Sequence, residues 1–242
     1  VNAALALKGQ PPMLLKRSES YIGTLIDDLV TKGTQEPYRM MTSRSEYRLV
    51  LRQDNADQRL CPIGHRIGLV SDARLQAVEE KYAAVEREIM RLTHTGVAGS
   101  DALNALLTAR GTAPVADGAR LIDLLRRPQV SYDDLRPFDP AAPELPGAVR
   151  EQVEISVKYE GYIRRQQRQV EDFEQLEKHA LPDRMDYSAI QGLRLEAREK
   201  LDAVRPLNLG QASRISGVSP ADVGALMIWL QTCLLYTSPS PR

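Results

Sequence analysis

The chain has 242 residues, a formal net charge of zero at pH 7 and only 5% aromatic residues. Zero net charge excludes a protein drawn to nucleic acid or membranes by its overall charge, so such binding would need a local patch. Its two cysteines, Cys61 and Cys233, have no metal-site or disulfide spacing. The longest apolar run, 225–230, is too short to span a bilayer, and no signal peptide opens the chain. We expect a protein of the cell interior with no membrane contact. Because the chain starts with Val1 and not Met, we expect a piece of a longer protein.

Residues 1–70 are predicted to be a small mixed α/β region. Residues 2–8 have the composition of a helix end, stopped by Gly9 and two prolines. A helix is predicted at 20–32, where apolar residues recur with a period of 3.6. At 46–52 polar and apolar residues alternate, which predicts a strand with one polar face.

The remainder is predicted to be all helical, so the fold class is mainly α. A long helix should open at Ser71 or Asp72, with apolar residues at heptad spacing at Leu75, Val78, Tyr82, Val85, Ile89 and Leu92. This seam fits either a coiled coil or an antiparallel helix pair. Further helices are predicted at 101–110, 118–127 and 148–181, with a proline-rich crossing at 136–147. No strand is expected after residue 70.

The long helix at 148–181 contains a glycine, Gly161. Glycine inside a helix costs about 1 kcal/mol relative to alanine. One explanation is that another helix or a ligand approaches the backbone closely at Gly161. The alternative is that the glycine is a tolerated packing residue.

An arginine-rich stretch at 39–66 is the candidate nucleic-acid surface. On the predicted strand, Arg44, Arg48 and Arg52 share one face and span about 26 Å at about 3.3 Å per residue. Arginine suits phosphate binding because its planar fork can bind two oxygens at once. We therefore predict that these three residues bind backbone phosphates of a nucleic acid. The alternative is a solvated face paired with the nearby Glu46, Asp54 and Asp57.

Residues 209–230 have the pattern of a helix-turn-helix. Gly217 would make the turn, Ser219 would cap the second helix, and Pro220 would occupy its first position. That helix has no Lys or Arg before Leu230, so a DNA-binding role is excluded on charge. We expect a packing or partner-docking unit, in which Leu226 and Trp229 share the face for the core or a partner.

No catalytic set, cofactor loop or metal cluster is recognisable. Cys61 and His65 are four residues apart and would allow a thiolate–imidazole pair. An incidental turn cysteine is the favoured interpretation, since no third residue would orient the pair. We therefore name no catalytic, cofactor-binding or metal residue.

Three long strings resemble the C-terminal portion of the MnmG (GidA) family. They are YIGTLIDDLVTKGTQEPYRMMTSRSEYRLVLRQDNADQRL at 21–60, KYEGYIRRQ at 158–166 and RPLNLGQASRISGVSPADV at 205–223. The resemblance implies a cytoplasmic, homodimeric flavoprotein that uses FAD, NADH and a methylene-tetrahydrofolate carbon. With the GTPase MnmE it modifies C5 of the wobble uridine of tRNA. Arg44, Arg48 and Arg52 fall in the family's arginine-rich segment, so the resemblance implies that they bind tRNA. The family's flavin loop and reactive cysteines would lie upstream of this chain, so we expect this part alone to be inactive and to retain neither FAD nor NADH.

The resemblance implies four ranges. They are a remnant of the flavin and substrate region (1–70), a helical domain (71–205), a small partner-docking unit (206–231) and a non-native tail (232–242). The tail resembles translated sequencing-adapter sequence and is expected to pack against nothing. The rival hypothesis is a free-standing helical adaptor that docks a protein and never binds RNA.

Overall fold

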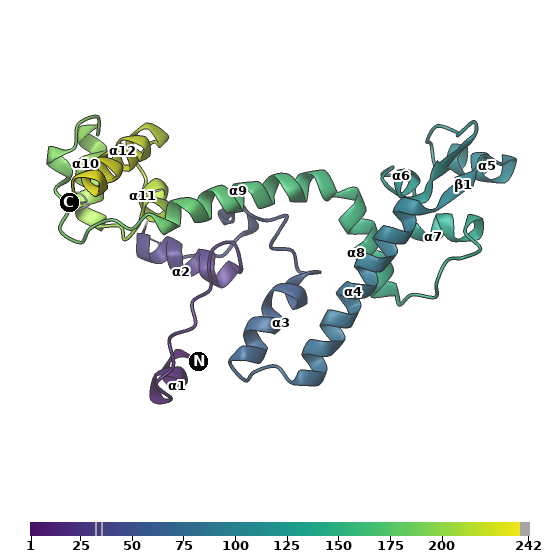
Figure 1. Ribbon diagram of the computed structural model, residues 1–242, viewed down its shortest axis with the longest axis horizontal. Coiled ribbons are helices and arrows are strands. Elements are labelled where there is room, and N and C mark those ends of the chain that lie inside the picture. Colours follow the sequence, from purple (N-terminus) through teal and green to yellow (C-terminus); the bar gives the residue numbers. More distant parts are fainter. Residues whose placement is uncertain (32, 35, 238–242) are drawn as a thin grey trace, which may run out of the picture. The chain divides into compact units, whose positions relative to one another are not determined.

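The chain folds mainly into helices, as predicted (Figure 1). The structure, a computed structural model, describes residues 1–31, 33–34 and 36–237, with side chains described through Thr232. Its contacts define two compact units. The first comprises Val1–Gly9 and Leu51–Arg165, and the second comprises Gln10–Val50 and the chain from Gln166 onward. These units differ from the ranges expected from the sequence, because residues 10–50 pack with the C-terminal helices.

The first unit is built around the long helix α4 (Asp72–His94), which packs against α3 (Ala56–Arg66) and α8 (Gly147–Lys158). Ser71 caps α4 by accepting a hydrogen bond from the backbone N–H of Arg74. The other elements are α1 (Asn2–Leu7), β1 (Gly96–Ala98), α5 (Asp101–Ala109), β2 (Gly118–Arg120), α6 (Leu121–Leu125), α7 (Tyr132–Leu135) and a 3-10 turn, η2 (Arg136–Phe138).

The heptad seam of α4 lies in the core of the first unit. Val85 and Leu92 are buried there beside leucines of α5 and α6, and Val153 of α8 is fully buried. The seam therefore serves packing between helices of one chain, which settles the choice between the two predicted alternatives in favour of the helix pair.

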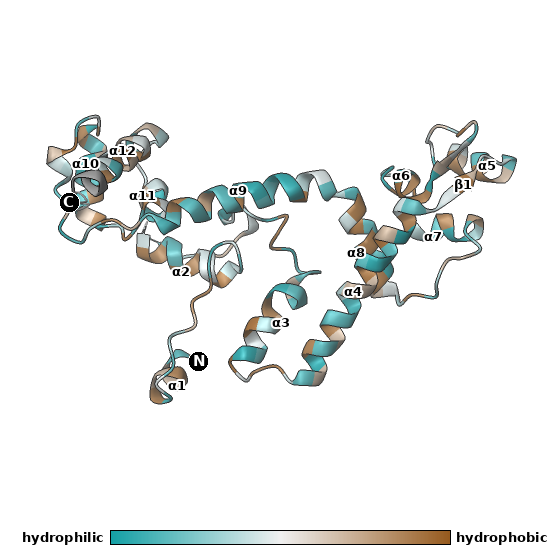
Figure 2. Ribbon diagram, in the orientation of Figure 1, coloured by the Kyte–Doolittle hydropathy of each residue, from teal (hydrophilic) through white to brown (hydrophobic). Residues whose placement is uncertain are grey.

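The second unit contains α2 (Tyr21–Thr31), the 3-10 turns η1 (Thr42–Arg44) and η3 (Tyr187–Ala189), α10 (Leu195–Val204), α11 (Leu209–Arg214) and α12 (Pro220–Thr237). Helix α9 (Glu160–Lys178) begins in the first unit and continues into the second. Helices α10, α11 and α12 bury an aliphatic core that includes Ile190, Leu201, Leu209 and Leu226. Figure 2 shows α9 as hydrophilic along most of its length.

The predicted turn between α11 and α12 is confirmed. Gly217 has a φ of 98°, which glycine adopts without steric cost. Ser219 and Asp222 cap α12: the Ser219 N–H donates to Asp222 Oδ2 (2.8 Å), and the Asp222 N–H donates to Ser219 Oγ (3.4 Å). Arg194 also donates to Asp222 Oδ2 at 2.7 Å. The hydrogen bonds from Arg194 and Ser219 hold the pKa of Asp222 well below its usual value, although burial opposes this shift.

Helix α2 forms where predicted, but it buries its polar face. Thr24 and Asp28 are 0% and 2% exposed, whereas Ile22 and Ile26 are 57% and 55% exposed. Gly23 lies on the buried face, where a Cβ would approach the carbonyl oxygen of Lys16 to 2.2 Å. The polar face is buried because it surrounds a buried arginine, described below.

Two predictions of strands are wrong. Residues 46–50 form a turn where a strand was expected, and the two strands of the described chain lie after residue 70. Strands β1 and β2 pair antiparallel over three residues each, with Val97 opposite Ala119. Strands this short give no alternation that the sequence could reveal.

Two helix boundaries also differ from expectation, and Pro62 lies inside α3. The helix predicted at 148–181 is two helices separated at Tyr159, and Gly161 lies in the first turn of α9. A Cβ at Gly161 would meet nothing within 4 Å, so no close contact explains this glycine. The backbone of α12 continues to Thr237, into the range expected to be an unstructured tail, and residues 238–242 lie outside the described residues.

Candidate nucleic-acid interface

A buried arginine organises the N-terminal part of the second unit. The side chain of Arg17 is only 4% exposed. Its Nη1 donates to Asp28 Oδ1 (2.7 Å) and Asp27 Oδ2 (3.0 Å), and its Nη2 donates to both oxygens of Glu46 (2.8 and 2.9 Å). Burial alone would lower the pKa of Arg17, but the hydrogen bonds to Glu46 and Asp28 raise it above its ordinary value. Arg17 therefore stays charged and offsets part of the negative charge of these three carboxylates.

A second buried arginine, Arg214 of α11, extends this network within the same unit. Its guanidinium contacts Asp27 (Nε–Oδ2, 2.7 Å) and Glu177 (Nη1–Oε1, 3.2 Å), and its side chain is 7% exposed. It also lies 4.8 Å from the centre of the Phe173 ring. Asp27 therefore bridges two buried arginines, which ties α2 to α11 and α9.

The turn at 46–50 is held on α9 by one glutamine. Gln166 is 9% exposed, and its Oε1 accepts from the backbone N–H groups of Leu49 and Val50, both at 2.8 Å. Its Nε2 donates to the carbonyl oxygen of Glu46 at 3.0 Å. The turn also buries Tyr47, whose ring meets Phe173 edge-on at 6.4 Å. Three hydrogen bonds and one buried ring fix the backbone on both sides of Arg48.

Two of the three predicted arginines are exposed and free of ion pairs with any described residue. Arg48 lies exposed in the turn that Gln166 holds. Arg44, in η1, is exposed and lies 5.1 Å from the centre of the Tyr38 ring. The expected partner Glu46 pairs with Arg17 instead. Neither Arg44 nor Arg48 therefore forms the ion pair with Glu46, Asp54 or Asp57 that the alternative interpretation expects.

Arg52, the third predicted arginine, is engaged within the chain. It lies in the first unit, where its Nε donates to both oxygens of Asp54 (3.0 and 3.1 Å). Gln152 Nε2 donates to the same carboxylate at 2.9 Å, and the Arg52 side chain is 20% exposed. The shared strand face expected for the three arginines does not exist, because residues 44–52 comprise a 3-10 turn, a second turn and the start of another unit.

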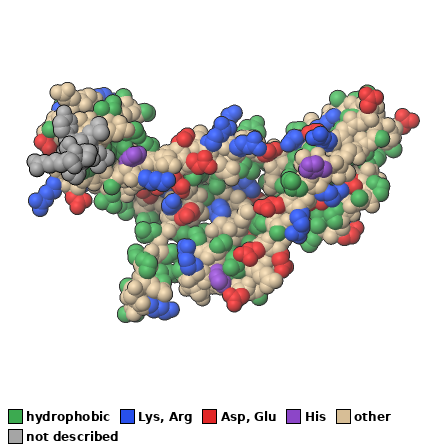
Figure 3. All heavy atoms as spheres, viewed as in Figure 1, with side chains coloured by type: hydrophobic (Ala, Val, Ile, Leu, Met, Phe, Trp, Pro, Cys, Tyr) green, Lys and Arg blue, Asp and Glu red, His purple; other side chains and the backbone are tan. Residues whose placement is uncertain are grey.

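Helix α9 carries an exposed arginine, Arg168, in the part that belongs to the second unit. Arg168 follows Gln166 by two residues, about 200° around the helix, so it lies on a different face from the one that holds the turn. Figure 3 shows Lys and Arg side chains gathered over the middle of α9.

The predicted docking residues are buried to different degrees. Leu226 is fully buried in the core of the second unit, so it cannot contact a partner directly. Trp229 is half-buried against the same core. The exposed large apolar residue of α12 is Ile228, at 67%. Leu226 is accordingly corrected from a docking residue to a core residue, because it points between α10, α11 and α12.

The candidate cysteine–histidine pair gains no catalytic support. Cys61 is half-buried in α3, and His65 Nε2 lies 2.6 Å from Asp72 Oδ1 at the start of α4. This contact joins the two helices. Within the described residues, no group of three or more His, Cys, Asp or Glu side chains could hold a metal ion.

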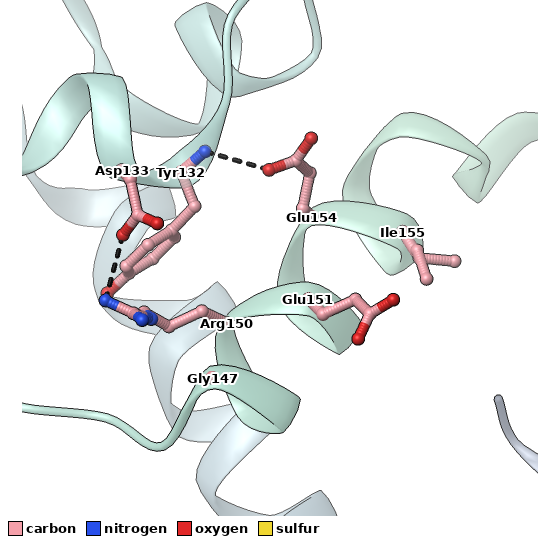
Figure 4. Close-up of a pocket in the computed structure, with 7 residues that line it drawn as sticks. All are labelled: Tyr132, Asp133, Gly147, Arg150, Glu151, Glu154 and Ile155. Carbon is pink, nitrogen blue, oxygen red and sulfur yellow. Dashed lines mark hydrogen bonds and ion pairs between the residues drawn. The ribbon is translucent and has the colours of Figure 1, made fainter.

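The first unit contains a separate hollow beside α7 and α8, with a volume of about 370 Å³. Two contacts cross it (Figure 4): Arg150 Nη1 donates to Asp133 Oδ1 at 2.9 Å, and the Tyr132 N–H donates to Glu154 Oε2 at 2.9 Å. These contacts join the two helices, and we assign no ligand to this hollow.

Sequence reasoning missed Arg17, Gln166 and Arg214. Gln166 closes one of the strings that carry the family resemblance, but nothing in its local pattern indicates a partner more than a hundred residues away. Arg214 is paired with Asp27, 187 residues away, and Arg17 is paired with Glu46, 29 residues away. Long-range polar contacts of this kind have no periodic signature.

Comparison with known proteins matches almost the whole chain to one protein family. Residues 72–167 match the model of the "tRNA modifying enzyme MnmG/GidA C-terminal helical domain", and residues 169–237 match that of the corresponding "C-terminal helical bundle". A relative from Caldicellulosiruptor saccharolyticus, "tRNA uridine 5-carboxymethylaminomethyl modification enzyme MnmG", is 54% identical over 231 residues. The Pelobacter propionicus enzyme of the same name is also 54% identical.

The matched region is only part of each relative. It covers 96% of this chain but 37% of both of those proteins. The solved structure of Aquifex aeolicus GidA has a TM-score of 0.75 and 39% sequence identity, covering 95% of this chain and 36% of that one. In the described part of the chain, no helix is both long and apolar enough to cross a membrane.

Proposed function

Because this chain belongs to the MnmG/GidA family and matches its C-terminal helical domains, we propose that it serves in an enzyme that modifies C5 of the wobble uridine in cytoplasmic tRNA. In this proposal, the exposed arginines of the second unit bind the tRNA backbone. The reaction itself, with its FAD and NADH, belongs to the intact homodimeric protein. The described residues contain no strand–glycine loop–helix that could hold a flavin pyrophosphate, so we assign none of them to the cofactor.

The observation that supports tRNA binding is that nearby carboxylates, which could compete with phosphate for the exposed arginines, are paired with Arg17. Asp27, Asp28 and Glu46 are held by Arg17 within the unit. Arg44 and Arg48 consequently face solvent without a described ion-pair partner. An arginine already paired with a carboxylate would have to lose that partner before binding phosphate, whereas these two would not.

The test is the salt dependence of tRNA binding by the 242-residue chain. Replacing Arg44 and Arg48 together by Ala should weaken binding and reduce the slope of log K against log salt by about 0.7–0.9 for each phosphate that the variant no longer binds. Arg126→Ala is the matched control, because Arg126 is exposed but ion-paired with Asp123 and Glu160. Arg52→Ala should leave the slope unchanged. An unchanged slope in the double variant would contradict the proposal.

We propose that the GTPase MnmE docks on the terminal helices, as the resemblance implies. The surface that supports this is exposed Ile228 on α12 together with Leu207 (64% exposed) before α11. Ile228→Asp should weaken capture of MnmE while leaving tRNA binding intact. MnmE binding that is unaffected by Ile228→Asp would remove this surface from the contact.

The rival function is a helical adaptor that docks a protein and does not bind RNA. The exposed apolar residues of α2 and α12 favour it, since such side chains can serve protein contacts. The two functions differ in their response to salt: tRNA binding weakens steeply as salt rises, while apolar docking does not. Absence of tRNA binding by the folded chain at low salt would favour the adaptor.

A further inference from the structure

A hollow on the second unit lies beside the arginines that the proposed function uses. It has a volume of about 370 Å³ and is lined by residues of the segment that follows α2, including Glu36, Pro37, Tyr38, Arg39 and Arg44. This volume is at the lower end of the range for small-ligand sites, about 300–1,000 Å³. Two of these side chains are cationic and one is anionic, so the lining has a net positive charge.

The Tyr38 side chain is held by a hydrogen bond to a buried carboxylate. Its hydroxyl donates to Asp28 Oδ2 at 2.7 Å, and Asp28 is 2% exposed and bound on its other oxygen by Arg17. Burial, followed by the bond to Asp28, raises the pKa of Tyr38. The hydroxyl therefore remains a hydrogen-bond donor to the carboxylate, and the ring keeps its orientation.

Arg44 lies over this fixed ring. Its guanidinium carbon is 5.1 Å from the ring centre, within the distance of a cation–π contact. Arg44 is nevertheless an exposed residue and forms no ion pair with any described side chain. The cation of Arg44 thus lies over an aromatic ring and remains accessible to a ligand.

A planar guanidinium on an aromatic ring is a platform for a nucleobase. Proteins recognise unpaired RNA bases by stacking them on aromatic rings and on arginine guanidinium planes. A phosphate requires charge alone, but a base requires a flat surface of this kind. Arg39, exposed on the same hollow, supplies a second cation for the adjoining phosphate.

We propose that this hollow binds one unpaired nucleotide of RNA, with its base stacked on Arg44 and its phosphate bound by Arg39. The proposal rests on the proposed function, RNA binding by this chain, and adds recognition of a base to binding of the backbone. Arg48, which lies outside the hollow, contributes charge only.

The experiment compares two single-stranded RNA probes with the 242-residue chain. One is a six-nucleotide RNA, and the other has the same sugar–phosphate backbone without bases. Wild-type protein should bind the RNA with bases about 5- to 100-fold more tightly, the range expected for stacking one base. Arg44→Lys keeps the charge and removes the plane, so it should lose this preference while binding the abasic probe as wild type does. Arg48→Lys, the matched control, should keep the preference.

The outcomes separate this proposal from the function on which it rests. Equal binding of both probes by wild type, or a preference that survives Arg44→Lys, overturns base stacking and leaves RNA binding in place. Failure of the folded wild-type chain to bind either probe or tRNA overturns both. If free AMP displaces the RNA with equal affinity, the site is a mononucleotide site and the RNA assignment is wrong. Thermal unfolding of each variant confirms that the fold is retained.

Discussion

Replacing Gln166 by Leu tests whether one side chain holds the arginine turn in place. The substitution keeps a similar volume and removes three hydrogen bonds, to the backbone at residues 46, 49 and 50. Each such bond contributes about 0.5–1.5 kcal/mol net. The Val50 N–H retains a turn bond to the Tyr47 carbonyl at 2.9 Å, which reduces the loss. We expect the turn to be destabilised by about 2–4 kcal/mol.

Native-state hydrogen exchange measures this directly. Protection of the Leu49 and Val50 amides should fall about 30- to 1,000-fold in Gln166→Leu, the equivalent of that free-energy loss. Gln166→Glu keeps the acceptor oxygen and removes the donor to Glu46, so its effect should be smaller. Gln167→Leu changes the exposed neighbour on α9 and should alter nothing. Unchanged protection in Gln166→Leu would refute the claim that Gln166 holds the turn.

The same variant predicts an effect on tRNA binding. Gln166→Leu removes no charge, so the salt dependence of binding should match that of wild type. The affinity should fall, because a loosened turn must be ordered again when Arg48 binds phosphate. A lower affinity with a changed salt slope would show that Gln166 acts by some route other than positioning.

Three further predictions concern the stability of the second unit and α9. Leu226→Asp should lower the free energy of unfolding by more than about 3 kcal/mol, because it buries an unpaired charge. Ile228→Asp, on the exposed face, should change it by no more than about 0.5 kcal/mol. Equal melting temperatures of the two variants would contradict this. Folding lowers the pKa of Asp222, so the ionised carboxylate stabilises the folded state. This stabilisation is complete above the pKa of the unfolded chain, about 3.9, and is lost as the pH falls below that value. Asp222→Asn should therefore cost about 1–2 kcal/mol at pH 7, chiefly because Arg194 loses a charged acceptor. The variant should also unfold with a smaller acid dependence, and a parallel acid profile would argue against this. Gly23→Ala should destabilise α2 through its backbone clash, while Gly161→Ala should stabilise α9 by up to about 1 kcal/mol; urea unfolding that reverses this order would contradict the packing described.

Helices that carry their own local signals were predictable from the sequence. The heptad seam and Ser71 located α4, and Ser219 with Pro220 located the start of α12. These signals are local because capping and periodicity depend on residues within a few positions of one another.

The arginine segment was not predictable in the same way. Alternation of Tyr47, Leu49 and Leu51 predicted a strand, yet Tyr47 is buried by a turn whose partner, Gln166, is distant in sequence. The apolar stripe of α2 predicted a helix, which forms, yet its polar face is the buried one because it surrounds Arg17. In both segments polar contacts outweighed a local hydrophobic pattern.

The composition of the interface was partly predictable. Arg44 and Arg48 were identified from charge density and are exposed, while Arg52 is paired with Asp54. Spacing alone could not distinguish them, since the carboxylate nearest in sequence to Arg48 is bound by Arg17.

We propose that tRNA binds this chain at the segment that contains Arg39, Arg44 and Arg48. Ultraviolet cross-linking of bound tRNA, followed by mass spectrometry of the peptides, locates the contact without altering the protein. We predict cross-linked peptides from residues 36–50 and from α9. Cross-links confined to the first unit, within residues 72–158, would contradict the account.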